Sequence, residues 1–203
     1  MVMYDLVLVV ADKNMDFTLR GILDRPRSLG IRAITYKTVV HPGHDGGVRT
    51  SGPDLLASLR SAVGHGIVML DLEGAGAAGD APSVEAELDW RLRPTWGNRA
   101  RSVVIEPELD AWIWGSDNAI RQALDCSIAD IRGWLRDSDF RFRPSRKPER
   151  PTEAFEHLMR ELKEQRASAI YRKITSKISL ERCSDSAFVR FKTMLQRWFP
   201  EDG

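Results

Sequence analysis

Three short apolar runs mark the first half of the chain, at 4–11, 66–72 and 102–106. Each is rich in valine, leucine or isoleucine, which is typical of a strand buried on both faces of a sheet. A further strand is predicted at 31–36, where the side chains alternate. Helical patterns separate these runs, and connections of that length favour parallel pairing. The pattern therefore predicts an α/β protein with a mainly parallel sheet flanked by helices.

Capping residues and prolines indicate where the helices begin. Asp16 is expected to cap a helix over 17–25. A glycine-rich loop is predicted at 41–52, and Pro53 is expected in the first turn of the helix that follows it. Pro107 is expected to open another helix directly after the last strand.

The second half of the chain has no strand signal after about residue 116. Apolar residues at helical spacing predict helices at about 153–166 and 186–198, and their aromatic stripes are expected to pack against the α/β body. The expected organisation is an α/β body at 1–140, a basic, proline-rich linker at 141–151 and a helical C-terminal extension at 152–203.

Composition narrows the class of protein. Of 203 residues, 42% are hydrophobic and 29% charged, which excludes collagen-like, disulfide-scaffold and largely disordered chains. No run approaches the roughly 18 apolar residues of a membrane span, and the N-terminus has no signal-peptide pattern. Cys126 and Cys183 form no motif. We expect a cytoplasmic protein with free thiols and no membrane partner.

The net charge of +1 conceals an asymmetry between two parts of the chain. Residues 1–140 hold 15 Lys and Arg against 20 Asp and Glu, a net charge of −5. Residues 141–203 hold 15 against 9, a net charge of +6. A basic segment after an acidic body indicates that the segment meets a polyanion, docks on the body or forms a solvated helical face.

Acidic residues follow three of the predicted strands. Carboxyl ends of parallel strands meet at one edge of a sheet, where ligands usually bind. Several carboxylates gathered there repel one another unless a divalent cation offsets the repulsion, and oxygen ligands favour Mg²⁺ or Mn²⁺. Ordinary helix capping is the alternative for each residue taken alone. The acids are Asp12 after the first run, Asp71 and Glu73 after the second, and Glu106, Glu108 and Asp110 after the third.

This pattern of acids resembles the Toprim (topoisomerase–primase) fold over about residues 4–115. That family has an acid after its first strand and an Asp-x-Asp after a later one. The stretch IEPELDAWIWGSD is similar to a signature of small Toprim-like proteins in bacterial phage-defence loci, with Glu108, Asp110, Ala111 and Asp117 at matching positions. The pattern ADKxM…PELDAW also resembles a component of methylation-associated defence systems.

The resemblance implies Mg²⁺-dependent cleavage of phosphodiesters within a prokaryotic defence system, with larger defence proteins as partners. It implies that Asp71 and Glu73 hold the cation with Glu108 as a further ligand, that Asp12 is the general acid or base, and that Lys13 contacts the phosphate. Two departures bear on activity. Asp12 stands where the family has glutamate, and Asp71-Leu72-Glu73 replaces Asp-x-Asp, so a reactive atom can be displaced by about 1 Å.

The basic linker is a candidate nucleic-acid-binding segment. Its cationic side chains are interleaved with Phe140 and Phe142, and this combination can grip phosphates and stack on bases. Alternatively, the phenylalanines cover the core and the cations pair with the acidic body. The candidate residues are Arg141, Arg143, Arg146, Lys147 and Arg150.

The remaining motifs give weaker evidence of function. His41, His44 and Asp45 have metal-ligand spacing, but without a third nearby ligand they are interpreted as a polar loop. No Gly-Lys-Ser/Thr phosphate loop occurs. Two alternatives to a nuclease stay open, a catalytically silent interaction module that assembles with larger proteins, and a phosphoacceptor with Asp71 as the acceptor. The sequence does not fix the oligomeric state.

Overall fold

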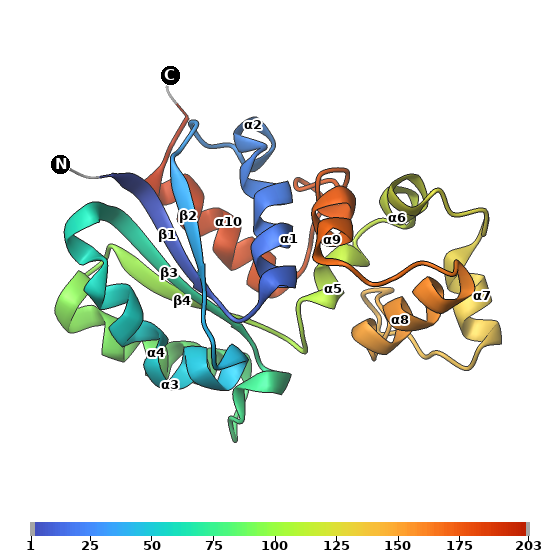
Figure 1. The fold of residues 1–203 in the computed structure, drawn as a ribbon, viewed down its shortest axis with the longest axis horizontal. Helices are drawn as coiled ribbons and strands as arrows, with labels where there is room; N and C mark the ends of the chain where they lie inside the picture. The colour runs from blue at the N-terminus through green and yellow to red at the C-terminus, as the bar shows by residue number, and fades with distance from the viewer. Residues whose placement is uncertain (1–2, 202–203) are drawn as a thin grey trace.

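The computed structural model describes residues 3–201. Four parallel strands form one sheet in the order β2-β1-β3-β4 (Figure 1). The prediction of an α/β protein with a parallel sheet flanked by helices is therefore confirmed. The strands are β1 (Tyr4–Val10), β2 (Tyr36–Val40), β3 (Val63–Asp71) and β4 (Ala100–Ile105).

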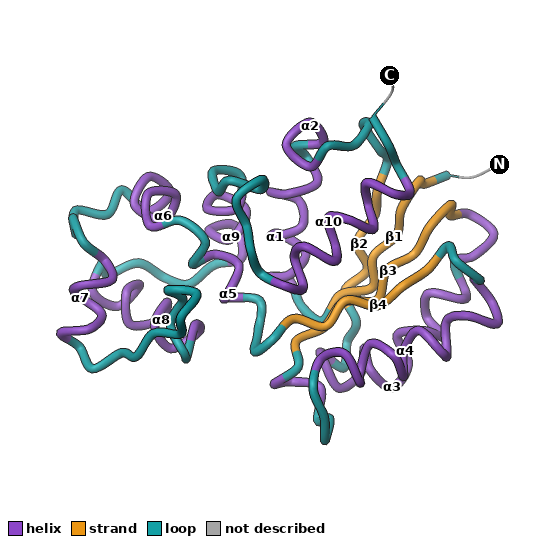
Figure 2. Tube along the Cα trace, turned by 180° about the vertical axis from the view of Figure 1, so that it is seen from behind, coloured by secondary structure: helices purple, strands orange, loops and turns teal. Residues whose placement is uncertain are grey.

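Helices cover both faces of this sheet. Helices α1 and α10 lie on one face and α3 and α4 on the other, as Figure 2 shows from behind. Helices α6, α7 and α8 form a smaller lobe beside the sheet, and α9 lies between this lobe and α1 (Figure 1). The helices are α1 (Lys13–Leu23), α2 (Pro26–Leu29), α3 (His44–Ser58), α4 (Ala81–Trp96), α5 (Asp110–Ile113), α6 (Asp117–Leu124), α7 (Ile131–Asp137), α8 (Pro151–Glu161), α9 (Ser168–Thr175) and α10 (Ser186–Trp198), with 3-10 turns at Arg60–Ala62 and Glu73–Ala75.

The three apolar runs form the centre of the core. Leu6–Val10 of β1, Ile67–Leu70 of β3 and Val103–Ile105 of β4 are buried on both faces. A continuous apolar run is the pattern expected for strands covered by helices on both sides. Because all four strands run the same way, their carboxyl ends meet at one edge of the sheet.

The strand predicted at 31–36 is wrong by about five residues, since β2 spans Tyr36–Val40. The segment before it is held by side-chain contacts and by a backbone hydrogen bond from the N–H of Leu6 to the carbonyl of Thr35 at 3.1 Å. The carboxylate of Asp5 accepts hydrogen bonds from the backbone N–H and the hydroxyl of Thr35, at 2.8 and 2.7 Å, and pairs with Arg32 at 2.8 Å. The alternating residues therefore belong to a segment that leads into β2 and is held against Asp5 of β1.

The first helix begins four residues earlier than predicted. Asp12 is its N-cap, and its Oδ1 accepts the N–H of Met15 at 2.8 Å. Asp16 instead lies inside α1, where it is buried and bonds to Arg20 and Thr38. Two aspartates spaced by four are both suitable caps, and the earlier one starts the helix.

The glycine-rich loop predicted at 41–52 is also wrong, because α3 runs through it from His44. Pro53 lies in the interior of α3 rather than in its first turn. A proline there leaves the carbonyl four residues earlier without its helical donor. Arg91 of α4 compensates, since its guanidinium donates to the carbonyl of Arg49 at 2.6 Å and to that of Thr50 at 2.7 Å.

Two further helix boundaries differ from the prediction. Pro107 does not open a helix directly, since α5 begins at Asp110. Helix α8 ends at Glu161, and a separate helix α9, which the pattern did not reveal, follows it at Ser168–Thr175. The prediction for the last helix agrees with α10 at both ends. Beyond β4 the described part of the chain has only the isolated bridge between Phe142 and Pro148.

The last helix completes the layers of the sheet. Its stripe of Phe188, Phe191 and Leu195 is buried, and both phenylalanine rings pack against Trp112 of α5. The predicted core role of this aromatic stripe is therefore confirmed. Within residues 3–201, no helix is both long enough and apolar enough to cross a bilayer.

Candidate functional site

Asp71 lies at the centre of the acidic edge, which we define as the carboxyl end of the sheet where Asp12, Asp45, Asp71 and Asp110 gather. It ends β3, and its Oδ1 is fully buried without a hydrogen-bond partner among the described residues. Its backbone N–H donates to Oδ1 of Asp45 at 2.7 Å. A buried polar atom with no partner is rare in a folded protein, and each case calls for an explanation.

The pKa of the Asp71 carboxyl is raised well above its ordinary value. Burial is the largest cause, and the charge of Asp45 is the next. A backbone hydrogen bond from Leu109 opposes the shift, while the charges of Asp110 and Asp12 add to it. Three carboxylates from three other segments thus lie within electrostatic reach of Asp71.

Asp45 is the member of this group that the sequence interpretation placed in a loop. It lies in the first turn of α3, and burial raises its pKa, with the charge of Asp12 adding to the shift. Its carboxylate packs closely against the backbone of Gly74, where a Cβ would come within 2.4 Å of Oδ2. Asp45 is therefore held between β3 and the turn after it.

Asp12 and Lys13 stand at the start of α1 beside this group. Asp12 is half-buried, and one of its oxygens is used to cap the helix. Lys13 is mostly exposed, and its Nζ lies 3.9 Å from the carboxylate of Asp16. The structure therefore brings Asp12 near Asp71 and leaves Lys13 free to move in solvent.

The glutamates predicted for the site lie differently. Glu73 is exposed in the turn after β3, and Glu106 is exposed after β4. Oε1 of Glu108 accepts the N–H of Thr152, in the first turn of α8, at 2.9 Å. Glu73 thus points to solvent and Glu108 serves the start of a helix, so neither is joined to Asp71 by a contact.

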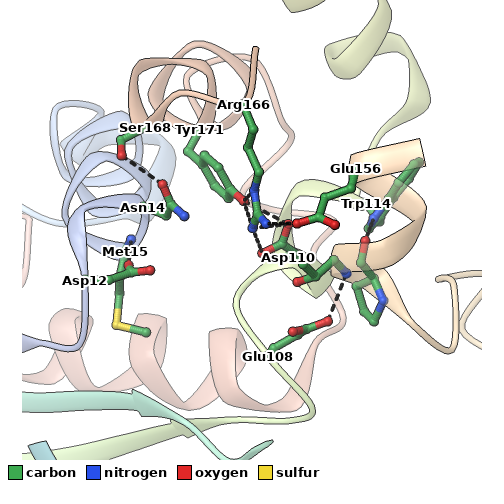
Figure 3. A network of polar contacts seen from close by, with 12 residues as sticks. Asp12, Asn14, Met15, Glu108, Asp110, Trp114, Glu156, Arg166, Ser168 and Tyr171 are labelled. Carbon is green, nitrogen blue, oxygen red and sulfur yellow. Dashed lines mark hydrogen bonds and ion pairs between the residues drawn. The ribbon is translucent and has the colours of Figure 1, made fainter. Parts of the chain in front are cut away.

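Asp110 is the centre of a separate polar network, shown in Figure 3. Both of its oxygens lie 3.2 Å from a guanidinium nitrogen of Arg166, and the hydroxyl of Tyr171 donates to Oδ1 at 2.9 Å. Arg166 also pairs with Glu156 at 2.8 Å. Burial raises the pKa of Asp110 to about 6, although the charge of Arg166 opposes this shift.

The network ties α9 to the acidic edge from the side opposite Asp12. In Figure 3, Asp12 stands at the start of α1 on one side, and Glu108 and Asp110 stand on the other. Asn14 of α1 accepts a hydrogen bond from the hydroxyl of Ser168 of α9 at 2.8 Å. Helix α9 therefore bridges the two sides of the edge.

The donors that best fit a divalent cation are the carboxylates of Asp45 and Asp71. Asp45 is half-buried, Oδ1 of Asp71 is buried without a partner among the described residues, and both carboxyls have raised pKa values, so a cation would offset an existing repulsion. Within the described residues, no three His, Cys, Asp or Glu side chains are arranged to hold a metal on their own. A cation here would keep several waters, as Mg²⁺ commonly does.

The predicted basic segment begins near the acidic edge. Arg143 and Lys147 line a cavity of about 290 Å³ together with Glu106 and Pro107, which follow β4. Lys147 pairs with Asp185, the N-cap of α10, at 2.8 Å and is largely buried. Arg143 is exposed.

The other basic residues divide into free and engaged side chains. Arg146 is exposed and lines a neighbouring cavity of about 340 Å³ with Arg182. Arg150 pairs with Glu153 at 2.5 Å. Arg141 is exposed beside a third cavity, away from Glu106. Of the predicted segment, Arg143 and Arg146 are thus the residues best placed to meet a polyanion near the acids.

The histidine motif has a structural explanation. His41 is buried, its Nδ1 accepts the N–H of Gly43 at 3.0 Å, and its Nε2 lies 2.9 Å from the hydroxyl of Ser51. A lone pair on Nδ1 and a proton on Nε2 satisfy both contacts. His44 is exposed and does not join it. Asp45 alone of this motif reaches the acidic edge.

Three residues of the edge were missed by sequence reasoning. Asp45 was visible, but the glycines around it suggested a loop. Arg166 and Tyr171 lie in a basic segment without a strong pattern, and nothing in their spacing relates them to Asp110. The one available signal was that a buried acid such as Asp110 requires a cation from elsewhere in the chain.

Comparison of the chain with protein-family models, with curated proteins and with solved structures finds no match.

Proposed function

We propose that this protein is a Mg²⁺-dependent, nuclease-like subunit that cleaves phosphodiesters in a prokaryotic anti-phage defence or DNA-processing system. The observation that carries the proposal is the buried Oδ1 of Asp71, which has no partner and lies near three other carboxylates. A site with excess negative charge and oxygen donors suits a hard divalent cation. The Toprim-like order of acids gives that cation its proposed use, and the cytoplasm is the proposed location.

The proposed roles follow from the contacts of each side chain. Asp71 and Asp45 hold the cation, which when bound polarises a phosphate oxygen and lowers the pKa of a water. Asp12 has one oxygen engaged in capping, which leaves the other to accept or donate a proton. Lys13 is exposed and long enough to contact a phosphate. Glu73 and Glu108 have lesser parts here than the resemblance implies.

The position of the basic residues supports a polymeric substrate. Arg143 shares a cavity with Glu106 at the carboxyl end of β4, and Arg146 and Arg182 line the next cavity. Neighbouring guanidinium groups beside an acidic edge suit a phosphate backbone that passes the proposed cation.

The experiment that tests the proposal is a cleavage assay with Mg²⁺ or Mn²⁺ on single-stranded, duplex and methylated DNA and on RNA. We expect cleavage that EDTA and Asp71→Asn abolish and that Asp137→Asn leaves intact, because Asp137 is an exposed aspartate at the end of α7. Absence of cleavage on all four substrates would reject the nuclease.

The second candidate is a catalytically silent module that assembles with larger defence proteins. The observation in its favour is that two of the predicted site acids have structural contacts, since Asp12 caps α1 and Glu108 accepts the N–H of Thr152 in the first turn of α8. Mn²⁺ binding that Asp71→Asn abolishes, without any cleavage, would favour this candidate over the nuclease.

A further inference from the structure

The outer edge of β4 is closed by side chains instead of by a strand. The N–H of Ser102 donates to Asp89 at 2.7 Å, and the N–H of Val104 donates to Glu85 at 2.8 Å. Arg190 of α10 donates to the carbonyl of Val104 at 3.3 Å and to Glu85 at 2.8 Å. Because these backbone groups are already bonded, this edge does not need another strand to satisfy them.

A cavity of about 610 Å³ lies over this closed edge, between α4 and α10. It is larger than the cavities that the basic segment lines, and its volume is in the range typical of small-molecule sites. Two of its lining residues are His65, near the amino end of β3, and Arg99, just before β4. The cavity is therefore at the opposite end of the strands from the acidic edge.

One wall of the cavity is aromatic and apolar. The ring of Trp198 stacks on that of His65, with centroids 4.7 Å apart and planes at 29°. Met194 is half-buried, and Val189 is 45% exposed. Burial and the charge of Arg99 lower the pKa of His65, which favours the neutral ring. Trp198, Met194 and Val189 give this wall aromatic and apolar surface against which a planar ring can pack.

The charges of the cavity are unbalanced toward the positive. Both of its acids are already engaged by arginines, Glu85 by Arg190 at 2.8 Å and Asp89 by Arg101 at 3.6 Å. Two further arginines remain. Arg99 makes one bond, to the carbonyl of Gly64 at 3.0 Å, and Arg197 is exposed and makes no ion pair among residues 3–201. Guanidinium groups with free N–H donors bind phosphate well.

We propose that this cavity binds a free nucleoside monophosphate, with the base against Trp198 and the phosphate at Arg197 and Arg99. The aromatic wall takes a planar ring, the free guanidinium groups take a dianion, and the cavity is large enough for both parts. Neither part alone explains the site, since a phosphate does not need the apolar wall and an uncharged ring does not need two arginines. The proposal is independent of the acidic edge.

The test is calorimetric titration of the full chain with 5′-AMP and 5′-GMP, beside adenosine and inorganic phosphate as the separate parts. We expect binding of at least one nucleotide at submillimolar concentration (about 10⁻⁴ M) and binding of each part at least about tenfold weaker. Arg197→Ala should weaken nucleotide binding about tenfold or more through the loss of a charged donor. Arg160→Ala, an exposed arginine on α8, is the matched control.

A second variant guards against a merely structural effect. Thr193→Trp places a large ring at an exposed position that lines the cavity, and it should block the nucleotide without removing any charge. Asp71→Asn should leave nucleotide binding unchanged, because Asp71 lies at the other end of the strands.

Three results would overturn the proposal. The first is no binding of either nucleotide at millimolar concentration. The second is inorganic phosphate that binds as tightly as AMP, which would make the cavity a simple anion site. The third is a short RNA strand that binds while AMP does not, with binding lost in Arg197→Ala, which would make the cavity part of a strand path.

Discussion

Two buried aspartates at the same edge of the sheet have opposite surroundings. Asp110 and Asp71 both have carboxyl groups whose pKa is raised by burial. Asp110 is held by Arg166 and by the hydroxyl of Tyr171, whereas the Oδ1 of Asp71 has no partner and its strongest charged neighbour is another acid, Asp45. The chain supplies a cation and a hydroxyl donor for Asp110, but among the described residues it supplies no partner for Oδ1 of Asp71.

The difference separates a structural ion pair from a site that requires something from outside. The Asp110 network joins α5 to α9, so it fixes where the later helices lie against the edge. The Asp71 carboxylate has a backbone hydrogen bond from Leu109 but no cationic partner, and its surroundings are explained best by a ligand that carries positive charge. Removing Arg166 should therefore destabilise the Asp110 network. Neutralising Asp71 should relieve its repulsion with Asp45.

The largest expected effect is from Arg166→Ala. This change leaves Asp110 buried without its cation, and we expect the free energy of unfolding to fall by about 3–5 kcal/mol at pH 7.5. Urea denaturation measures the loss, with Arg160→Ala as the control. Adding Asp110→Asn to Arg166→Ala should recover part of the loss, since the unpaired charge is then gone. A loss below about 1 kcal/mol would mean that the two aspartates do not differ as described.

The next effect is from Gly74→Ala. The added Cβ would lie 2.4 Å from Oδ2 of Asp45, so the carboxylate must move. We expect a loss of about 1–3 kcal/mol and weaker Mn²⁺ binding by calorimetry. Gly79→Ala is the control, because its Cβ meets only the Cβ of Ser83 at 3.6 Å. Unchanged Mn²⁺ binding in Gly74→Ala would show that Asp45 is no ligand.

Asp71→Asn should have a smaller effect of the opposite sign. Neutralising the buried carboxylate removes its repulsion with Asp45, and we expect a gain of about 1–2 kcal/mol in the absence of divalent cations. The same variant should lose the stabilisation that Mn²⁺ gives the unchanged protein. Thermal unfolding with and without Mn²⁺ measures both, against Asp137→Asn. A destabilised variant that still responds to Mn²⁺ would argue against a cation at Asp71.

The smallest effect is in the pH dependence of stability without metal. A carboxyl whose folded pKa is raised contributes stability below its unfolded pKa, near 3.8, and loses that contribution as the pH rises through the folded pKa. For Asp110 this window is about pH 4–6. We expect stability to fall as the pH rises from about 4 to 6, and we expect Asp71→Asn to make this fall shallower by about 1 kcal/mol or less, because the raised pKa of Asp71 adds to the fall. Urea titrations at several pH values would contradict the assignment if both proteins gave the same slope.

The sequence predicted the parts of this molecule that depend on local pattern. Continuous apolar runs identified β1, β3 and β4, and aromatic spacing identified α10 with both of its ends. The parallel direction of the strands followed from the helices between them. Parallel strands in turn place Asp12, Asp71 and Asp110 at the same edge of the sheet.

The parts that escaped prediction depend on contacts between distant segments. Helix α3 contains glycines and an interior proline, and it is supported by Arg91 of α4, which no local pattern reveals. Asp45 was hidden for that reason. Arg166 lies 56 residues from Asp110, and only the folded chain shows that the two belong together.

The position of α10 has a consequence for the order in which the protein is made. This helix contains residues 186–198, yet it covers one face of a sheet whose strands all precede residue 106. The apolar side chains of β4 and α5 stay uncovered during translation until that helix has left the ribosome. Nascent chains that carry residues 1–185 on a C-terminal linker long enough to span the ribosomal tunnel should therefore be captured by chaperones, and chains that carry residues 1–203 on the same linker should not.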